Sequence, residues 1–378
     1  MKNYLILTVY GLTLSLVLQS GVNANCASPA FIKINQEIFL EENYHALELR
    51  STFDRKVLEH EPYDLVSDIK WASPDGFDLT MDIYTPNTGK LSYPVIVMFH
   101  GGGWLMNNKS IMKSASEFLV EHGEYVVCNV NYRLLGDMDN TVTMNEIIED
   151  AFGAVLWVKS NITRFKGDPS KVILTGDSAG GHLAAITTLQ GDQLSSKRFD
   201  GAPHGFRPSW LPNGKTAEDV ARENGLKVQA AIISYGGFDL HRLCKDSAYE
   251  SSSNIFWSLG NTQARGIFGN EFNVTDNPEF YKKVSPAYNI PKEDTYVPPM
   301  LFTVGEYDDL TTPASIREFI SAMEQAGHNN LQYWVHEGRP HAFLDSGTNE
   351  FLGIKFEDDA IPALEFMIEY LDEIFYNQ

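Results

Sequence analysis

Ser178 lies in a segment that can fold in few ways. The pentapeptide Gly176-Asp177-Ser178-Ala179-Gly180 directly follows the apolar run Val172–Thr175 and leads into the helix-compatible segment Gly180–Leu189. A strand that turns at once into a helix holds a serine hydroxyl clear of the backbone, and this turn needs residues almost without side chains two positions before and after the serine. The helix then directs its free N–H groups and the positive end of its dipole toward that hydroxyl. The motif therefore indicates an exposed nucleophile, and an ordinary glycine-rich turn is the alternative.

The hexapeptide from Gly176 to Gly181 is also close to the Gly-Asp-Ser-Gly-Gly sequence around the nucleophile of chymotrypsin-like proteases. In that fold the serine comes after its histidine and aspartate along the chain. Ser178 lies in the middle of this chain, and its candidate partners lie downstream. The order of the residues therefore excludes the chymotrypsin-like interpretation.

An expected hairpin is followed, after residue 84, by strand-like and helix-like segments that alternate. The runs Leu65–Trp71 and Phe77–Tyr84 flank the turn Ser73–Gly76 and predict a hairpin. The further expected strands are 94–99, 125–131, 172–175, 228–234, 300–304 and 331–335, and the expected helices are 111–121, 145–160, 180–189, 314–326 and 356–375. This alternation predicts an α/β fold with a mostly parallel central sheet that is flanked by helices on both faces.

Three stretches lie outside the alternation and are candidates for a cap or lid. They are the leader 27–60, the polar segment 192–227, which is rich in Gly and Pro, and the segment 238–290, which is rich in aromatic residues. Long insertions in a compact domain are often lids or binding loops. An elaborated surface is the alternative for each of them. We expect one catalytic domain over residues 25–378 that carries these insertions.

Residues 1–24 have the pattern of a secretory signal peptide. Lys2 precedes the uncharged apolar stretch Tyr4–Leu18, and Val22-Asn23-Ala24 is a suitable cleavage site. The apolar stretch is short for a membrane span. We therefore expect a secreted protein, extracellular or periplasmic, without stable membrane insertion, and an uncleaved anchor is the alternative.

The cysteines and glycosylation sequons depend on that compartment. Cys128 lies in a strand-like run and is expected to be a buried small hydrophobe, whereas Cys26 and Cys244 could pair under oxidising conditions. Sequons for N-glycosylation are present at Asn108, Asn161 and Asn273.

The charge of the chain limits its partners. The formal net charge is −21, and no cluster of Lys and Arg is present that could follow a phosphate backbone. We therefore expect no nucleic acid as a partner, and strongly anionic substrates or membranes are disfavoured. No Cys or His cluster has the spacing of metal ligands, so neither a metal nor another cofactor is expected.

A glycine-rich loop follows the expected strand 94–99. It reads His100-Gly101-Gly102-Gly103-Trp104, and consecutive glycines let backbone N–H groups face a developing negative charge. An oxyanion hole needs a donor from such a loop and one from the residue after the nucleophile, which is Ala179. The sequence does not determine how each peptide of the loop is oriented, so three donors stay open. Gly102 and Gly103 are the first candidates, and Gly101 is the next.

Candidates for an acid and a base follow Ser178 in that order. Asp308 comes just after the strand 300–304, at the edge where α/β sheets bind ligands, and Asp309 and Glu306 are its rivals. An acid here would hold an imidazole in the correct tautomer.

Two histidines near the next strand are candidates for the base. His341 lies in the loop after the strand 331–335, where it can reach over the sheet edge, and His336 at the strand end is the structural alternative. His100 and His182 flank glycine turns, and we expect both to make local hydrogen bonds.

These residues, in this order, resemble the α/β-hydrolase superfamily. The chain is most similar to the hormone-sensitive-lipase-like carboxylesterases and to related secreted acetyl or feruloyl esterases. The matching motifs are His100-Gly101-Gly102-Gly103-Trp104, Asn131-Tyr132-Arg133-Leu134, Gly176-Asp177-Ser178-Ala179-Gly180-Gly181, Glu306-Tyr307-Asp308 with Leu310, and His341. The resemblance implies a Ser178–Asp308–His341 triad, an oxyanion hole from the glycine loop and Ala179, and no cofactor.

The chain departs from this branch at three places. Leu135-Gly136-Asp137 stands where the branch usually has Ala-Pro-Glu, Ala342 stands where Gly commonly follows the histidine, and Asp308-Asp309-Leu310 stands where Asp-Pro-Leu is frequent. None of the three removes a catalytic group, although they bear on the substrate class.

The first hypothesis is a secreted serine carboxylesterase. Its substrates would be small esters or acylated polysaccharide, such as acetyl or feruloyl esters of plant polysaccharide. The alternatives are an amide or peptide hydrolase of the same fold, such as a formamidase or an exopeptidase, a lipase, or a non-catalytic binding protein. The sequence does not predict an oligomeric state.

Overall fold

The computed structural model describes residues 4–9, 12–17, 61–350 and 352–377. Strands β1 (Tyr4–Val9) and β2 (Leu12–Val17) form a two-stranded sheet of their own. The leader 27–60, Cys26 and the proposed cleavage site lie outside the described residues, so the signal peptide and the role of the leader as a cap stay predictions.

The body of the protein is built on one eight-stranded sheet with the order β10-β9-β8-β7-β5-β6-β4-β3. Its strands are β3 (Tyr63–Ala72), β4 (Leu79–Pro86), β5 (Tyr93–Phe99), β6 (Val126–Val130), β7 (Gly167–Asp177), β8 (Ala230–Ser234), β9 (Met300–Gly305) and β10 (Leu331–His336). The pairs β3–β4 and β4–β6 are antiparallel, and every other neighbouring pair is parallel. The predicted hairpin and the mostly parallel sheet are both confirmed.

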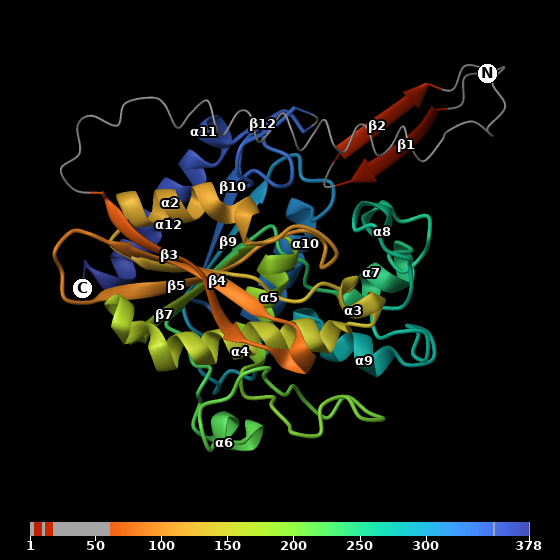
Figure 1. Ribbon diagram of the computed structural model, residues 1–378. Helices are drawn as coiled ribbons and strands as arrows, with labels where there is room; N and C mark the ends of the chain where they lie inside the picture. Colours follow the sequence, from red (N-terminus) through yellow and green to blue (C-terminus); the bar gives the residue numbers. More distant parts are fainter. Residues whose placement is uncertain (1–3, 10–11, 18–60, 351, 378) are drawn as a thin grey trace. The chain divides into compact units, whose positions relative to one another are not determined.

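Helices cover both faces of this sheet (Figure 1). The helices α2 (Lys113–His122) and α12 (Ile361–Phe375) pack together on one face, and α4 (Met144–Asn161) and α5 (Ala179–Gln190) pack together on the other. All residues of β5 and β6 are buried, because strands covered on both faces expose neither side to water. The remaining long helix, α10 (Pro313–Gln325), packs against β9.

The other elements are short. The remaining helices within the described ranges are α3 (Asp137–Asn140), α6 (Ala217–Arg222), α7 (Leu240–Asp246), α8 (Ile255–Leu259), α9 (Pro278–Lys283) and α11 (Phe356–Asp359). Turns of 3₁₀ helix occur at Pro74–Gly76, Lys109–Met112, Ile162–Phe165 and Pro286–Tyr288, and β11 (Thr348–Asn349) pairs with β12 (Ile354–Lys355).

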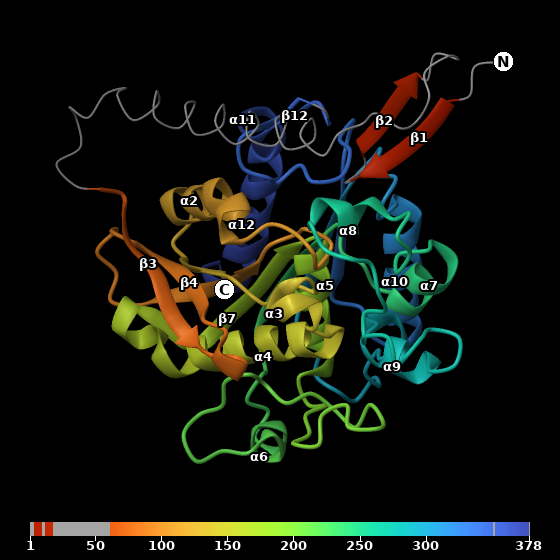
Figure 2. The same cartoon turned by 45° about the vertical axis from the view of Figure 1, so that its right-hand side comes forward.

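The two described insertions differ in structure. Segment 238–290 contains α7, α8 and α9, and these helices gather beside α10 (Figure 2). Segment 192–227 contains α6 and an isolated bridge between Leu194 and Phe206. No strand pattern was expected in this second segment, and the structure forms no extended strand there.

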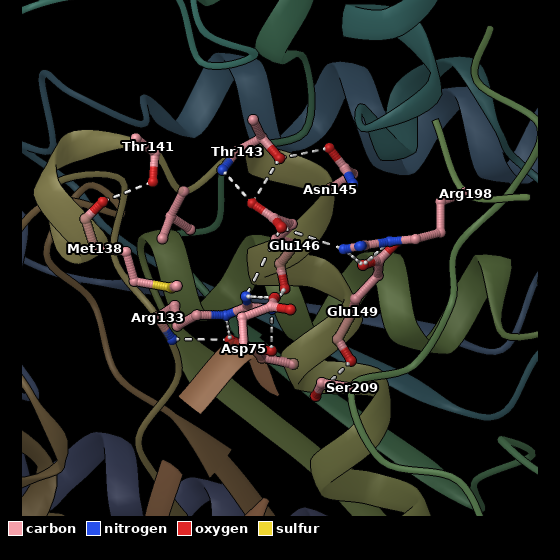
Figure 3. A network of polar contacts seen from close by, with 12 residues as sticks. Asp75, Arg133, Met138, Thr141, Thr143, Asn145, Glu146, Glu149, Arg198 and Ser209 are labelled. Atoms are coloured by element: carbon pink, nitrogen blue, oxygen red, sulfur yellow. Dashed lines mark hydrogen bonds and ion pairs between the residues drawn. The ribbon is translucent and has the colours of Figure 1, made fainter. Parts of the chain in front are cut away.

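An ionic network fastens segment 192–227 to α4 (Figure 3). The Arg198 guanidinium bonds the carboxylate of Glu149, whose side chain is only 1% exposed. Next to it the buried Arg133 pairs with Asp150 on the same helix at 2.8 Å. The polar segment therefore has a specific anchor on the sheet-covering helix.

The residues singled out for their chemistry lie as follows. Cys128 is fully buried in β6, which confirms the expectation for this residue, and Cys244 in α7 is buried with a free thiol. Of the sequons, Asn108 and Asn273 are exposed and Asn161 is partly buried. Among the described residues, no helix is both long and apolar enough to cross a bilayer, and no His, Cys, Asp or Glu cluster could hold a metal.

Candidate active site

Ser178 stands at the turn between β7 and α5 in a strained backbone conformation. Its φ is 51° and its ψ is −114°, a region that residues other than glycine rarely adopt. The turn is held on both sides, since the Ser178 N–H donates to the Ser234 carbonyl at 2.9 Å and the His182 N–H donates to the Ser178 carbonyl at 3.0 Å. The strain is therefore balanced by fixed hydrogen bonds to β8 and α5.

The glycines at positions 176 and 180 allow the strand and the helix to approach each other. A Cβ on Gly176 would lie against the Gly180 backbone, and a Cβ on Gly180 would lie well inside van der Waals contact with the Phe99 carbonyl. A side chain at either position would push the helix away from β5 and β7. The need for glycine at these places, inferred from the motif, has this physical cause.

The structure brings Ser178, His341 and Asp308 together, although they come from different parts of the chain. His341 Nε2 lies 2.9 Å from Ser178 Oγ, and His341 Nδ1 lies 2.7 Å from Asp308 Oδ2. His341 is fully buried, Asp308 is 3% exposed and Ser178 is 8% exposed. A nucleophile, a base and a carboxylate in one hydrogen-bonded chain can perform nucleophilic catalysis.

Asp308 is held so that one oxygen faces the imidazole. Its Oδ1 accepts the N–H groups of Leu310 at 3.0 Å and Thr311 at 2.8 Å, which leaves Oδ2 for the Nδ1–H of His341. With the proton on Nδ1, the Nε2 lone pair faces the serine hydroxyl. The carboxylate thus sets the tautomer that a general base needs.

The rival residues have other positions. Asp309 and Glu306 are exposed, and no hydrogen bond among the described residues joins either to His341. His336 donates from Nε2 to the Asp359 carbonyl at 2.8 Å, a contact that belongs to the scaffold. The structure therefore groups Asp308 and His341 with Ser178, and leaves the three rivals outside that group.

Two features around His341 have no signal in the sequence. The buried ring of Tyr235 packs edge-on against the imidazole, with ring centroids 4.7 Å apart. Ala342 has a φ of 66°, a left-handed backbone conformation that glycine adopts most easily. This conformation fits the glycine that commonly follows the histidine in the esterase branch that the chain resembles. An alanine at position 342 does not by itself predict a left-handed backbone conformation, and Tyr235 belongs to no recognisable motif.

In the loop after β5, four consecutive carbonyl groups accept hydrogen bonds. The Tyr132 hydroxyl donates to the His100 carbonyl at 2.6 Å, and His100 Nδ1 donates to the Gly101 carbonyl at 2.7 Å. The Gly102 carbonyl accepts the N–H groups of residues 105 and 106, both at 3.0 Å, and the Gly103 carbonyl accepts the Tyr249 hydroxyl. Because a trans peptide is planar, fixing each carbonyl also fixes the following N–H on the opposite side.

This arrangement corrects the expectation for Gly101. Its N–H donates to Asp177 Oδ1 at 2.6 Å and is therefore not available to a substrate. Burial raises the pKa of Asp177 above its usual value, although the carboxylate also accepts the Asp177 backbone N–H. Gly101 thus anchors the loop to the residue before the nucleophile.

The amides that remain are those of Gly102, Gly103 and Ala179. In the described part of the chain no backbone or side-chain group accepts the N–H of Gly102 or Gly103. Ala179 is the first residue of α5, so its N–H has no carbonyl one turn earlier in the helix. Gly103 and Ala179 line the same cavity as Ser178, which makes them suitable donors to a developing oxyanion.

His100 makes the local hydrogen bond expected of it, whereas His182 bonds Trp104 and Val284, which are distant in the sequence, so the expectation of local bonds is wrong for His182. Burial lowers the pKa of each to about 4, so both imidazoles are neutral near pH 7. His182 Nδ1 accepts the indole N–H of Trp104 at 3.2 Å, and Nε2 therefore carries the proton that is donated to the Val284 carbonyl at 2.8 Å. Neutral His182 links α5, the glycine loop and segment 238–290.

A cavity of about 670 Å³ opens over Ser178. Its walls come mainly from segment 238–290 and from α10. The larger apolar and aromatic residues of the lining are Trp104, Phe238, Leu240, Leu243, Tyr249, Phe256, Tyr288, Leu310 and Phe319. The charged residues of the lining are Asp239, Arg242, Asp246 and Glu318, so acidic groups outnumber basic ones. Segment 238–290, one of the candidates for a cap, supplies much of this lining, whereas segment 192–227 contributes no residue to it.

Comparisons with known proteins agree with this architecture. The BD-FAE family model matches residues 81–323. Esterase LipQ from Mycobacterium tuberculosis is 27% identical over 272 residues, which cover 69% of this chain and 55% of LipQ. Phenmedipham hydrolase from Pseudarthrobacter oxydans is 31% identical over 150 residues, which cover 39% of this chain and 30% of the hydrolase. The chain thus spans about half the length, or less, of these curated relatives.

Among solved structures, the chain is similar to esterase 2 of Thermogutta terrifontis. The form phosphonylated by sarin has a TM-score of 0.58 and 24% identity, covering 85% of this chain and 99% of that chain. The butyrate-bound form has a TM-score of 0.56 and 24% identity, covering 84% and 96%. At this identity the likeness shows the fold, which is the α/β-hydrolase fold expected from the motifs.

Proposed function

The chain belongs to the BD-FAE family, and from this membership and the geometry around Ser178 we propose that the protein is a carboxylic ester hydrolase. The observation that carries the proposal is the hydrogen-bonded chain from Asp308 through His341 to Ser178, beside the amides of Gly103 and Ala179. Two similar proteins named above are an esterase and a hydrolase, which supports the same reaction class.

In the proposed acylation step, Ser178 Oγ attacks the ester carbonyl carbon. The hydroxyl proton moves to His341 Nε2, and the carbonyl electron pair moves to its oxygen, which accepts the N–H groups of Gly102, Gly103 and Ala179. When this intermediate collapses, the bond from carbon to the alcohol oxygen breaks. The imidazolium gives its proton to the leaving alkoxide, and an acyl-enzyme remains.

In the proposed deacylation step, His341 takes a proton from water, and the resulting nucleophile attacks the acyl carbon. The bond to Ser178 Oγ then breaks, and the serine recovers its proton from the imidazolium. Asp308 stays ionised and stabilises the imidazolium in both steps. No cofactor is needed for this cycle.

For the substrate, we propose short-chain or aryl esters, including acetyl and feruloyl esters of polysaccharide. The aromatic and aliphatic lining of the cavity supports an apolar acyl or aryl group, and about 670 Å³ is enough for a ligand larger than acetate. Comparing acetylated xylan, methyl ferulate and triglycerides of graded length tests this choice. A clear preference for long triglycerides would contradict it and favour a lipase.

The direct test of the reaction uses purified protein with p-nitrophenyl acetate and butyrate. Wild-type protein is expected to hydrolyse both, and Ser178→Ala is expected to lose about 10⁴-fold or more in kcat because the nucleophile is gone. Ser253→Ala is the matched control, since this serine is exposed and lies outside the cavity lining. Equal activity of Ser178→Ala and wild type would overturn the assignment.

The alternatives give different results in two further assays. An amide or peptide hydrolase would cleave an arylamide at least as well as the matching ester. A binding protein without catalysis would not react with a fluorophosphonate probe at Ser178, whereas the proposed esterase is expected to be labelled there and the Ser178→Ala variant is not.

A further inference from the structure

The donors that fix the glycine loop come from two different parts of the protein. The carbonyls of His100, Gly101 and Gly102 are held by groups on the core or on the loop itself. The Gly103 carbonyl is held by the hydroxyl of Tyr249, which belongs to segment 238–290. The last peptide of the loop therefore depends on a residue 146 positions away in the sequence.

Tyr249 is itself firmly placed. Its side chain is 2% exposed, and its carbonyl accepts the indole N–H of Trp257 at 2.7 Å. Its ring packs edge-on against Trp104, with ring centroids 5.9 Å apart. Burial raises the pKa of its phenol well above the usual value, so the hydroxyl stays a donor over the whole working range of an enzyme.

The glycine loop needs a hydrogen bond from outside because its own backbone can adopt many conformations. Gly102 and Gly103 have φ values of 124° and 57°, and Trp104 follows with a φ of 59°. Glycine peptides in this region rotate with little steric resistance. A rotation of the Gly103–Trp104 peptide would turn the Gly103 carbonyl oxygen away from Tyr249, where it could face a developing oxyanion. It would also change the backbone conformation of Gly103, whose own N–H belongs to the preceding peptide, held at the Gly102 carbonyl by residues 105 and 106.

We propose that Tyr249 is a positioning residue for the oxyanion hole, whose hydroxyl fixes the Gly103–Trp104 peptide and so makes the hole depend on the folded insertion 238–290. The inference rests on the proposed esterase function and extends it. Tyr249 transfers no proton and forms no bond to the reacting carbon in this role. It keeps the Gly103–Trp104 peptide in place beside the donors before the reaction, so that the hole needs no reorganisation when charge develops.

The test is Tyr249→Phe, which keeps the ring and removes the donor. Losing an oxyanion donor outright costs about 10²- to 10³-fold in kcat, and loosening one indirectly is expected to cost about 5- to 50-fold. KM for p-nitrophenyl butyrate is expected to stay within about 2-fold, because the ring still lines the cavity and the lost stabilisation acts on the transition state.

Tyr125→Phe is the matched control. Tyr125 is fully buried, its hydroxyl donates to Asp372 at 2.6 Å, and it lies outside the cavity lining. Both variants lose one hydrogen bond of a buried phenol, so a comparable loss in thermal stability is expected. Only Tyr249→Phe is expected to lose kcat, and an unchanged kcat in this variant would overturn the proposal.

A crystal structure of Tyr249→Phe gives a second readout that does not depend on catalysis. We expect the Gly103–Trp104 peptide to be rotated or to occupy two orientations. An unmoved peptide contradicts a positioning role even when kcat falls. If the wild type hydrolyses no ester, the proposed function fails, while the orientation of this peptide still decides whether Tyr249 holds the loop.

Discussion

At the scale of single residues, Asp308 and Asp309 differ by one position and by their whole environment. Asp308 is buried and bonds the imidazole, and Asp309 is exposed and does not. Asp308→Asn would leave the shape of the site intact but favour the wrong tautomer of His341. We expect a loss of up to about 10⁴-fold in kcat for this variant.

Asp309→Asn is the natural control, because it removes the same charge one residue away. It is expected to retain kcat within a few-fold of wild type on p-nitrophenyl butyrate. Should Asp309→Asn show the larger loss, the acid has been assigned to the wrong carboxylate.

The catalytic side chains of this site could be predicted from the sequence, whereas the orientations of the backbone peptides in the glycine loop could not. Ser178, Asp308 and His341 could be chosen because strand–loop order restricts which side chains reach one sheet edge. The orientation of Gly101 depends on a bond to Asp177, and the orientation of the peptide after Gly103 depends on Tyr249. Such bonds join distant segments and leave no local pattern, so the sequence predicts Gly101 as a donor and gives no indication of a role for Tyr249.

At the scale of elements, the repeating core could be predicted and the insertions could not. Apolar runs bounded by turns indicate buried strands directly, as β5 to β9 show. The helices α7, α8 and α9 have five to seven residues each, too short for a recognisable helical period. They are stabilised by burial of aromatic residues such as Trp257 and Tyr281 rather than by their own propensity.

Segment 192–227 is anchored by the ion pair of Arg198 with Glu149, and this pair predicts how the stability of the protein depends on pH. Burial raises the pKa of Glu149 to about 7, although Arg198 and the backbone N–H of Arg207 favour its ionised form and Glu146 opposes it. At Glu149 the folded protein therefore binds more protons than the unfolded chain between about pH 4.5 and 7. Because the pKa of Glu149 is higher in the folded protein than in the unfolded chain, the free energy of unfolding falls as the pH rises through this window.

Glu149→Gln removes this titration and is expected to flatten the decline. Between pH 5 and 7.5, the free energy of unfolding of wild type should fall by on the order of 1–3 kcal/mol more than that of the variant. Urea unfolding at both pH values measures the difference. Arg198→Met is expected to steepen the decline because the buried carboxylate loses its counter-charge, and the double variant should resemble Glu149→Gln. Equal slopes in wild type and Glu149→Gln would contradict the interpretation.

At the scale of the whole molecule, the charge of the chain and the charge of the cavity have the same sign. The formal net charge is −21, and among the described residues the lining over Ser178 contains three carboxylates and a single guanidinium, that of Arg242. Arg242 faces Glu318 at 3.4 Å and Asp246 at 3.9 Å, so its charge is already balanced. A neutral ester enters such a site without opposition, whereas an anionic acyl group meets a negative potential.

This potential predicts discrimination between two esters that share a leaving group. At low salt, kcat/KM for mono-p-nitrophenyl succinate is expected to be about 10-fold or more below that for p-nitrophenyl butyrate. The gap should narrow as salt rises, since the Debye length falls from about 30 Å at 0.01 M to about 10 Å at 0.1 M ionic strength. A general intolerance of the longer acyl group would leave the ratio independent of salt.

Two variants on one helix separate the cavity from the molecule as a whole. Glu318 and Glu324 are both exposed on α10, and only Glu318 lines the cavity. Each change to Gln removes the same charge, but Glu318→Gln also removes one of the two carboxylates that balance Arg242. We expect Glu318→Gln to raise kcat/KM for the succinate ester several-fold and leave the butyrate ester unchanged, while Glu324→Gln alters neither. If both variants raised kcat/KM for the succinate ester equally, the discrimination would be caused by the net charge of the protein and not by the charges of the cavity over Ser178.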